Sequence, residues 1–148
     1  MAPISEIIEI DRRPEDVFSY FMDPSHMPEW QESVVSARRL DDGPAAVGSR
    51  VVVTRRVGGR NREMTNELTE QNPPTSWVVR GIDTPVRATA KGRIEPVGNG
   101  ERSRVTIELD FEGRGIGKLL VPLVVRRQAE AEMPKNMRKL KELLESGT

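Results

Sequence analysis

The sequence predicts an α+β fold in which a curved antiparallel sheet of about seven strands wraps around a long C-terminal helix and leaves an internal cavity. Three observations predict it. Segments of alternating apolar and polar residues follow one another with turn residues between them. Two short helical segments come after the first of these, and a helical period of apolar residues closes the chain. A chain of 148 residues matches one domain, expected to span residues 1–148.

The first elements are a strand and two short helices. Residues 4–10 are rich in isoleucine and partly alternate, which predicts a strand with one buried face. Residues 14–22 open with a proline that suits a first helical turn, and Glu15 and Asp16 suit the positive end of the helix dipole. A serine followed by a proline predicts a shorter second helix over residues 25–30.

Six further strands are predicted in the middle of the chain. They cover residues 34–39, 49–57, 62–71, 76–82, 86–96 and 103–113. Turn residues such as Gly58-Gly59 separate them and connect antiparallel neighbours. In the last segment, Val105, Ile107 and Leu109 alternate with polar residues, so one face of the sheet should be buried and the other wet.

The C-terminal segment returns to a helical period. Met133, Met137, Leu140 and Leu144 recur at intervals of four, three and four residues, which indicates one buried stripe. A helix over residues 118–145 would be on the order of 40 Å long, enough to cross the whole sheet. We therefore expect it to cover one sheet face.

Composition excludes several classes of function. Without cysteine there is neither a disulfide nor a thiolate metal site, and a cytoplasmic location is expected. The 23 basic and 23 acidic residues balance, so nucleic acid is not expected as a partner. The N-terminus does not have the pattern of a secretory signal, and the longest apolar run is too short to span a bilayer, so stable membrane insertion is not expected.

No catalytic constellation is recognisable. His26 is the only histidine, which excludes a paired-histidine metal site, and we interpret it as a surface residue at a helix end. There is no Gly-x-Ser-x-Gly motif, and the glycine-rich residues 113–118 do not match the spacing of a phosphate-binding loop. Most strand carboxylates fall on the wet face. We expect no metal and no cofactor, and the catalytic residues remain unknown.

Alternation places two polar side chains on inward faces of the predicted sheet. Arg55 shares a face with valines, and Asn66 shares one with Met64 and Leu68. These residues, with Arg127 from the polar middle of the last helix, are candidate anchors for a polar-tipped ligand; internal pairing or a register error is the alternative. The candidate apolar contacts are Phe21, Trp30, Met64, Leu68, Trp77, Ala90, Val105, Ile107 and Leu109.

The order of elements and several motifs resemble a known superfamily. Residues 8–18 (IEIDRRPEDVF) look like the opening strand, proline and first helix of the polyketide cyclase/dehydrase and lipid-transport branch of the START-like, or SRPBCC, proteins. Residues 47–49, 66–74, 113–115 and 122–127 are similar to later parts of the same pattern. The resemblance covers nearly the whole chain and implies the helix-grip fold. Its motifs bear on architecture rather than on activity.

Three functions stay open at this point. The first is binding of a small hydrophobic molecule, which is lipid-, polyketide- or steroid-like, in a cavity to which the small residues Ala88, Ala90 and Gly92 give room. The second, permitted by the resemblance, is a cyclase or dehydratase that uses the same cavity. The third is a non-catalytic interaction or stress-associated module that uses its surface. Oligomeric state is not indicated.

Overall fold

The computed structural model describes residues 3–83, 86–113 and 121–147. In chain order the elements are β1 (Ile4–Ile10), α1 (Pro14–Met22), the 3₁₀ helix η1 (Pro24–His26), α2 (Met27–Trp30), β2 (Val34–Arg39), β3 (Arg50–Val57), β4 (Arg60–Asn72), β5 (Ser76–Gly81), β6 (Val86–Val97), β7 (Arg102–Gly113) and α3 (Val121–Ser146).

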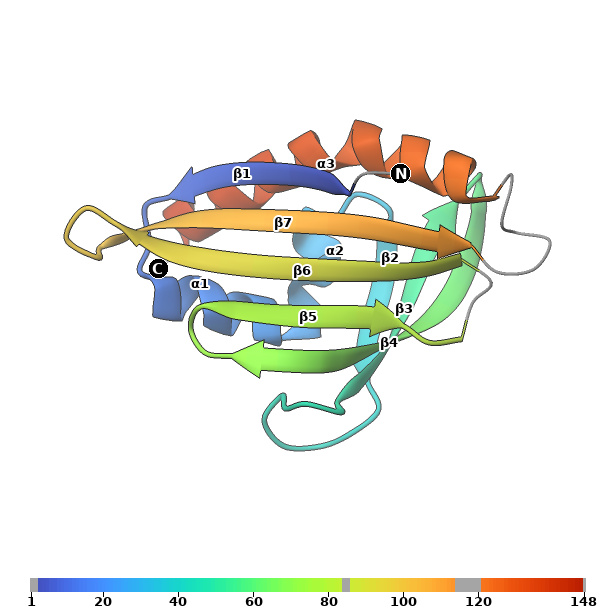
Figure 1. Cartoon of the computed structure of the whole chain (residues 1–148), viewed down its shortest axis with the longest axis horizontal. Helices are drawn as coiled ribbons and strands as arrows, with labels where there is room; N and C mark the ends of the chain where they lie inside the picture. Colours follow the sequence, from blue (N-terminus) through green and yellow to red (C-terminus); the bar gives the residue numbers. More distant parts are fainter. Residues whose placement is uncertain (1–2, 84–85, 114–120, 148) are drawn as a thin grey trace.

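The strands form one antiparallel sheet of seven, in the order β1-β7-β6-β5-β4-β3-β2. Strands β2 to β7 follow one another as a meander, and β1 pairs with β7. Figure 1 shows the sheet curling, with α1 and α2 behind its front strands and α3 running along the edge formed by β1. The predicted helix-grip architecture is confirmed, because the curved sheet packs against the long C-terminal helix.

The residues of the turns explain where one strand of the meander ends and the next begins. The hairpin between β3 and β4 has a loop of two residues, Gly58 and Gly59, with φ of 59° and 79°. Two consecutive positive φ angles match the mirror-image turns that suit the twist of paired strands. Because this loop is so short, β4 begins at Arg60, two residues before the predicted start.

The core lies between α3, α1 and the concave face of the sheet. Met133, Met137, Leu140 and Leu144 are all buried, which confirms the predicted stripe on α3. They join one apolar cluster with residues of β1, β6, β7 and α1. Burial of such side chains stabilises the fold by about 1.5–3 kcal/mol each.

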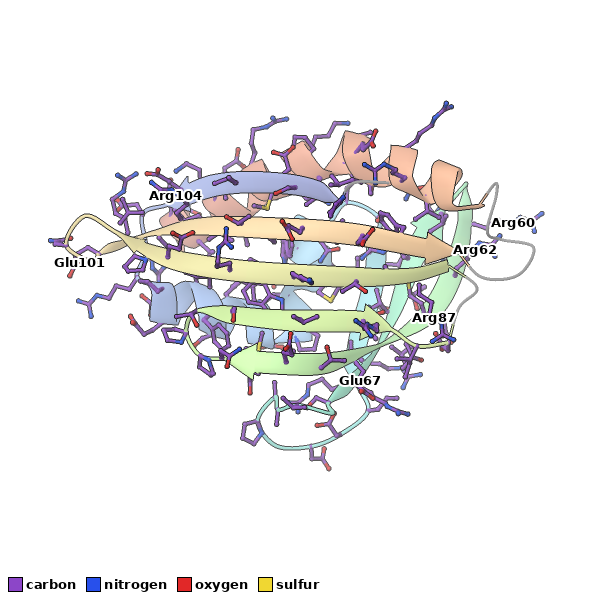
Figure 2. All side chains as sticks on the ribbon, viewed as in Figure 1. Arg60, Arg62, Glu67, Arg87, Glu101 and Arg104 are labelled. Atoms are coloured by element: carbon purple, nitrogen blue, oxygen red, sulfur yellow. The ribbon has the colours of Figure 1, made fainter. Side chains whose placement is uncertain are left out.

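The opposite face of the sheet is wet, as the alternation predicts. Figure 2 shows Arg104 and Glu67 on this face. Arg104 lies 3.3 Å from a carboxylate oxygen of Glu9, and the Nε of Arg50 donates to Glu67 over 3.0 Å. These exposed pairs contribute little to stability, typically below about 1 kcal/mol each.

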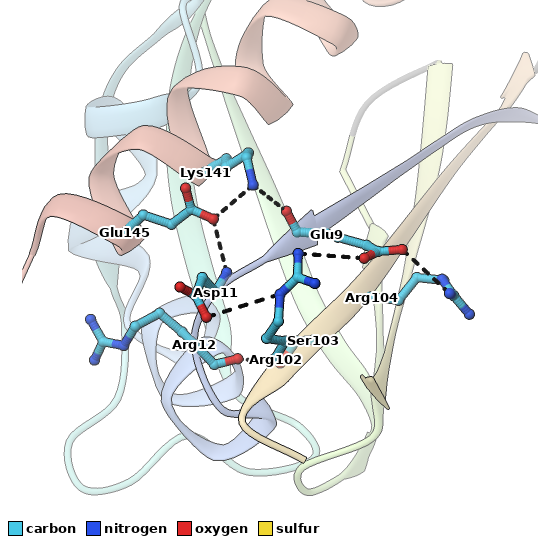
Figure 3. A network of polar contacts seen from close by, with 8 residues as sticks. All are labelled: Glu9, Asp11, Arg12, Arg102, Ser103, Arg104, Lys141 and Glu145. Atoms are coloured by element: carbon cyan, nitrogen blue, oxygen red, sulfur yellow. Dashed lines mark hydrogen bonds and ion pairs between the residues drawn. The ribbon is translucent and has the colours of Figure 1, made fainter. Parts of the chain in front are cut away.

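A polar network ties the C-terminal half of α3 to the end of β1 (Figure 3). Lys141 Nζ donates to the backbone oxygen of Glu9 over 2.7 Å and to Glu145 Oε2 over 2.7 Å. The same carboxylate accepts from the backbone N–H of Asp11 over 2.9 Å. Arg12 Nη1 donates to the backbone oxygen of Leu144 over 2.9 Å. The end of α3 is therefore held on the sheet by directional contacts as well as by burial.

Candidate functional site

A cavity of about 760 Å³ lies on the concave side of the sheet. Its walls come from β3 to β7, from α1 and the short helices after it, and from α3. The volume falls within the roughly 300–1,000 Å³ that is usual for small-molecule sites. Exposed residues such as Arg60 and Glu63 also line it, so it reaches the protein surface.

The strand period explains the sheet wall of the cavity. On β3, Val51, Val53, Arg55 and Val57 all line it, as expected for every second residue of a strand. On β4 the lining residues include Met64, Asn66 and Leu68. The register places Val53 opposite Met64 and Val51 opposite Asn66, so the two strands present one continuous surface.

An aromatic group closes one side of the cavity. The rings of Phe21 and Trp77 have centroids 4.4 Å apart, and those of Phe21 and Trp30 are 5.6 Å apart. The Trp77 ring lies over Gly92, its partner across the β5–β6 pair, where an added Cβ would come within 2.1 Å of the indole. Gly92 therefore makes room for tryptophan, whereas Ala88 and Ala90 line the open volume.

Most of the residues that the sequence singled out surround this one cavity. Those that line it are Phe21, Trp30, Arg55, Met64, Asn66, Leu68, Trp77, Ala90, Ile107 and Leu109. Val105 faces the same side of β7 but has 0% exposure in the closed core. Arg127 is exposed and does not line the cavity, because the helical period turns Gln128 and Ala129 towards it instead.

Arg55 is a mostly buried cation in the wall. Its Nη1 donates to Ser33 Oγ over 2.8 Å, and its Nη2 donates to Gln31 Oε1 over 2.8 Å. Burial lowers the pKa of Arg55, and the negative charge of Glu132 acts in the opposite direction. Arg55 lies opposite Arg62 of β4 in the sheet. Asn66 lies four residues further along β4. The two predicted anchors thus occupy separate parts of the cavity.

Sequence reasoning missed the polar residues that α3 contributes. Gln128, Glu132 and Asn136 line the cavity at intervals of four residues. Asn136 Oδ1 accepts from the backbone N–H of Glu32 over 3.0 Å, which connects α3 to the segment after α2. Each of these residues comes one position before a member of the buried stripe (Ala129, Met133 and Met137), so the three flank that stripe on the helix, and a search of the flanking positions would have found them.

A second polar group lies at the rim, on α1 and the short helices. Tyr20 lines the cavity, and its hydroxyl donates to Glu29 Oε1 over 2.8 Å. Burial raises the pKa of Tyr20, with a further contribution from Glu29. The ring of His26 stacks on Tyr20 at 4.1 Å and its Nδ1 lies 3.2 Å from Glu29. His26 is therefore at a helix end, as predicted, but it is only partly exposed.

Among the described residues, no group of three or more histidine, cysteine, aspartate or glutamate side chains lies close enough together to bind a metal ion. Over the same part of the chain, no helix combines the length and the apolar character needed to cross a membrane.

Comparison with known proteins identifies related sequences and folds. The family model described as "Polyketide cyclase / dehydrase and lipid transport" matches residues 1–145. The fold is similar to a START superfamily protein from Mycobacterium smegmatis, with a TM-score of 0.80, 17% identity and 100% of each chain covered. A protein from Thermus thermophilus is similar with a TM-score of 0.79 and 16% identity, and 99% of each chain is covered. Zhui aromatase/cyclase from a Streptomyces species is similar with a TM-score of 0.74 and 15% identity, and the match covers 95% of this chain and 94% of that one. No curated protein matches the chain.

Proposed function

The chain belongs to the polyketide cyclase/dehydrase and lipid transport family, and on this basis we propose that it binds a small hydrophobic molecule in its cavity. The observation that carries the proposal is the cavity of about 760 Å³ between the sheet and its helices. Aliphatic and aromatic side chains such as Leu68, Trp77 and Leu109 form much of its wall. Apolar walls with a few placed polar groups are typical of ligand sites.

Retention of a ligand tests this proposal directly. Native mass spectrometry of freshly purified protein should show an added mass that organic extraction releases as a small apolar molecule. Ala90→Trp fills the cavity from β6 and should abolish the added mass. Thr89→Trp, at the neighbouring position outside the cavity lining, is the matched control and should retain it. Equal retention by both variants would place the molecule outside the cavity and contradict the proposal.

A second candidate is a cyclase or dehydratase that uses the same cavity. The observation that favours it is the presence of Glu132 and Tyr20 in the lining together with Arg55. A carboxylate can accept a proton from an activated methylene, and a guanidinium can stabilise the oxygen anion that forms at a carbonyl. Ring closure followed by loss of water needs both of these roles.

Turnover separates this candidate from binding alone. The protein would be incubated with a poly-β-ketone thioester, and the appearance of an aromatic product would be followed by absorbance and mass. An enzyme should give a product at a rate that Glu132→Gln lowers by about 100-fold or more. If the product forms no faster than in buffer, the protein has no activity on this substrate, and binding remains its supported function.

A further inference from the structure

Arg55 and Arg39 both line the cavity, but the guanidinium of Arg39 is paired with a carboxylate and that of Arg55 is not. Arg39 Nη2 donates to Asp41 Oδ2 over 2.8 Å. Arg55 donates only to the neutral oxygens of Ser33 and Gln31, each over 2.8 Å. Across the described residues, no carboxylate oxygen lies within 4.0 Å of its guanidinium. The cavity wall therefore holds a positive charge that is hydrogen-bonded but not ion-paired.

Arg55 is less accessible to water than two other arginines of the lining. Arg60 and Arg62 also line the cavity, yet both are exposed at the start of β4 (Figure 2). Arg55 is mostly buried, and desolvation disfavours its charged form, which lowers the pKa of Arg55. An arginine in a protein nevertheless stays protonated. Its charge is thus left in a site of low polarity, where an anion interacts more strongly than it would in water.

The hydrogen bonds of Arg55, which lines the cavity, use two of its N–H groups. A guanidinium carries five N–H groups in one plane. Ser33 and Gln31 lie in the short segment between α2 and β2, so their two bonds hold that plane from one side. The remaining donors have no hydrogen-bond partner among the described residues. A planar guanidinium with paired free donors matches the geometry of a carboxylate or a related acid.

We infer that the bound molecule carries one acidic group, a carboxylate or a similar oxyacid, and that Arg55 binds this group. The inference rests on the proposed binding function. Ser33 and Gln31 are the positioning residues. The apolar part of the molecule extends along the cavity towards Trp77 on β5, two strands away in the sheet. The negative charge of Glu132 acts on Arg55 and opposes an acidic ligand, so its removal should strengthen binding of the acid.

Two fluorescent probes with nearly the same apolar skeleton test the inference. 8-Anilinonaphthalene-1-sulfonate carries an acidic group, and N-phenyl-1-naphthylamine lacks it. Arg55→Met should weaken the sulfonate by about tenfold or more, as expected for loss of a charge-assisted contact. The same change should alter the affinity for the neutral probe by less than about twofold. Arg56→Met, which removes an exposed arginine at the next position of β3, should leave both affinities unchanged.

Glu132→Gln keeps Arg55 and its partners in place, and it should tighten the sulfonate but not the neutral probe. Circular dichroism of each variant establishes that it folds. The acid-binding role is overturned if Arg55→Met binds each probe with the same affinity as the unaltered protein does. It is also overturned if Glu132→Gln leaves the affinity for the sulfonate probe unchanged. In both cases the binding function stands. If neither probe binds the unaltered protein, the proposed function fails and the inference fails with it.

Discussion

Trp77 and Gly92 show how one residue pair shapes the cavity. They lie opposite each other across β5 and β6, and the indole covers the glycine. Phe18 meets the same indole edge-on, with ring centroids 6.0 Å apart, so the ring is held on a second side. The tryptophan cannot move away from an added methyl group without disturbing its other contacts.

Gly92→Ala should therefore lower the free energy of unfolding by about 1–3 kcal/mol, the usual cost of overpacking. Urea unfolding followed by fluorescence measures it. Gly81→Ala is the matched control, because the nearest atom to an added Cβ there is Asn66 Oδ1 at 3.4 Å, an ordinary contact. In a Trp77→Leu background the effect of Gly92→Ala should largely disappear. An equal loss for Gly81→Ala would refute the role of the ring.

At the scale of elements, an irregularity in β4 decides which side chains face inward. Up to Leu68 the inward residues are the even-numbered Met64, Asn66 and Leu68. The register with β5 then shifts between Leu68 and Glu70, and Gln71 pairs with the inward Trp77. Gln71 Nε2 donates to the backbone oxygen of Ala45 over 3.0 Å. A single extra residue has thus moved the odd-numbered positions to the inner face.

The polar network that holds the end of α3 on β1, formed by Lys141 and Glu145 with the backbone of Glu9 and Asp11, is a second feature at this scale. It predicts a pH dependence of stability. Hydrogen bonds from Lys141 and from the Asp11 N–H lower the pKa of Glu145 from its ordinary 4.5. A lowered pKa means that the folded state favours the ionised form. The stabilisation is therefore present above about pH 4.5 and is lost as the pH falls below it.

Glu145→Gln should destabilise the protein at pH 7 and flatten the loss of stability between about pH 5 and 3. Thermal unfolding across this range measures both effects. Glu142→Gln, at an exposed position on the same helix, should keep the pH profile of the unaltered protein. Identical pH profiles for the two variants would show that this polar network does not contribute to the pH dependence of stability.

At the scale of the whole molecule, the cavity interrupts the core between sheet and helices. Ile10, Val17, Val105 and Leu140 have 0% exposure and form the closed part of the core. The remaining space is walled by apolar groups that make fewer contacts than a packed interior would provide. A molecule that fills this space should stabilise the folded state as a whole.

N-Phenyl-1-naphthylamine should therefore raise the melting temperature. At a free concentration of about 100 times its Kd, binding to the native state alone adds about 2.7 kcal/mol of stability. Differential scanning fluorimetry at several concentrations measures the shift. The Ala90→Trp variant should show none, and a shift of the same size in that variant would place the probe elsewhere.

Local residue patterns alone predicted most of the fold. The alternation of β3 and β7, the turn at Gly58-Gly59 and the apolar stripe of α3 are set by periods of two and of 3.6 residues, which can be read directly from the chain. The same periods predicted that Arg55 and Asn66 face inward. They did not predict the shift in β4, because a single extra residue in one strand leaves no pattern of its own.

What the sequence determined by itself is therefore the order of elements and the inward face of most strands. Only the tertiary structure decided which inward positions meet open space, because that depends on where α1, α2 and α3 pack. Val105 faces inward but is closed off, Arg127 turns outward, and Glu132 enters the cavity unforeseen. The neutral partners of Arg55 come from another segment of the chain, and contacts between distant segments leave no local period.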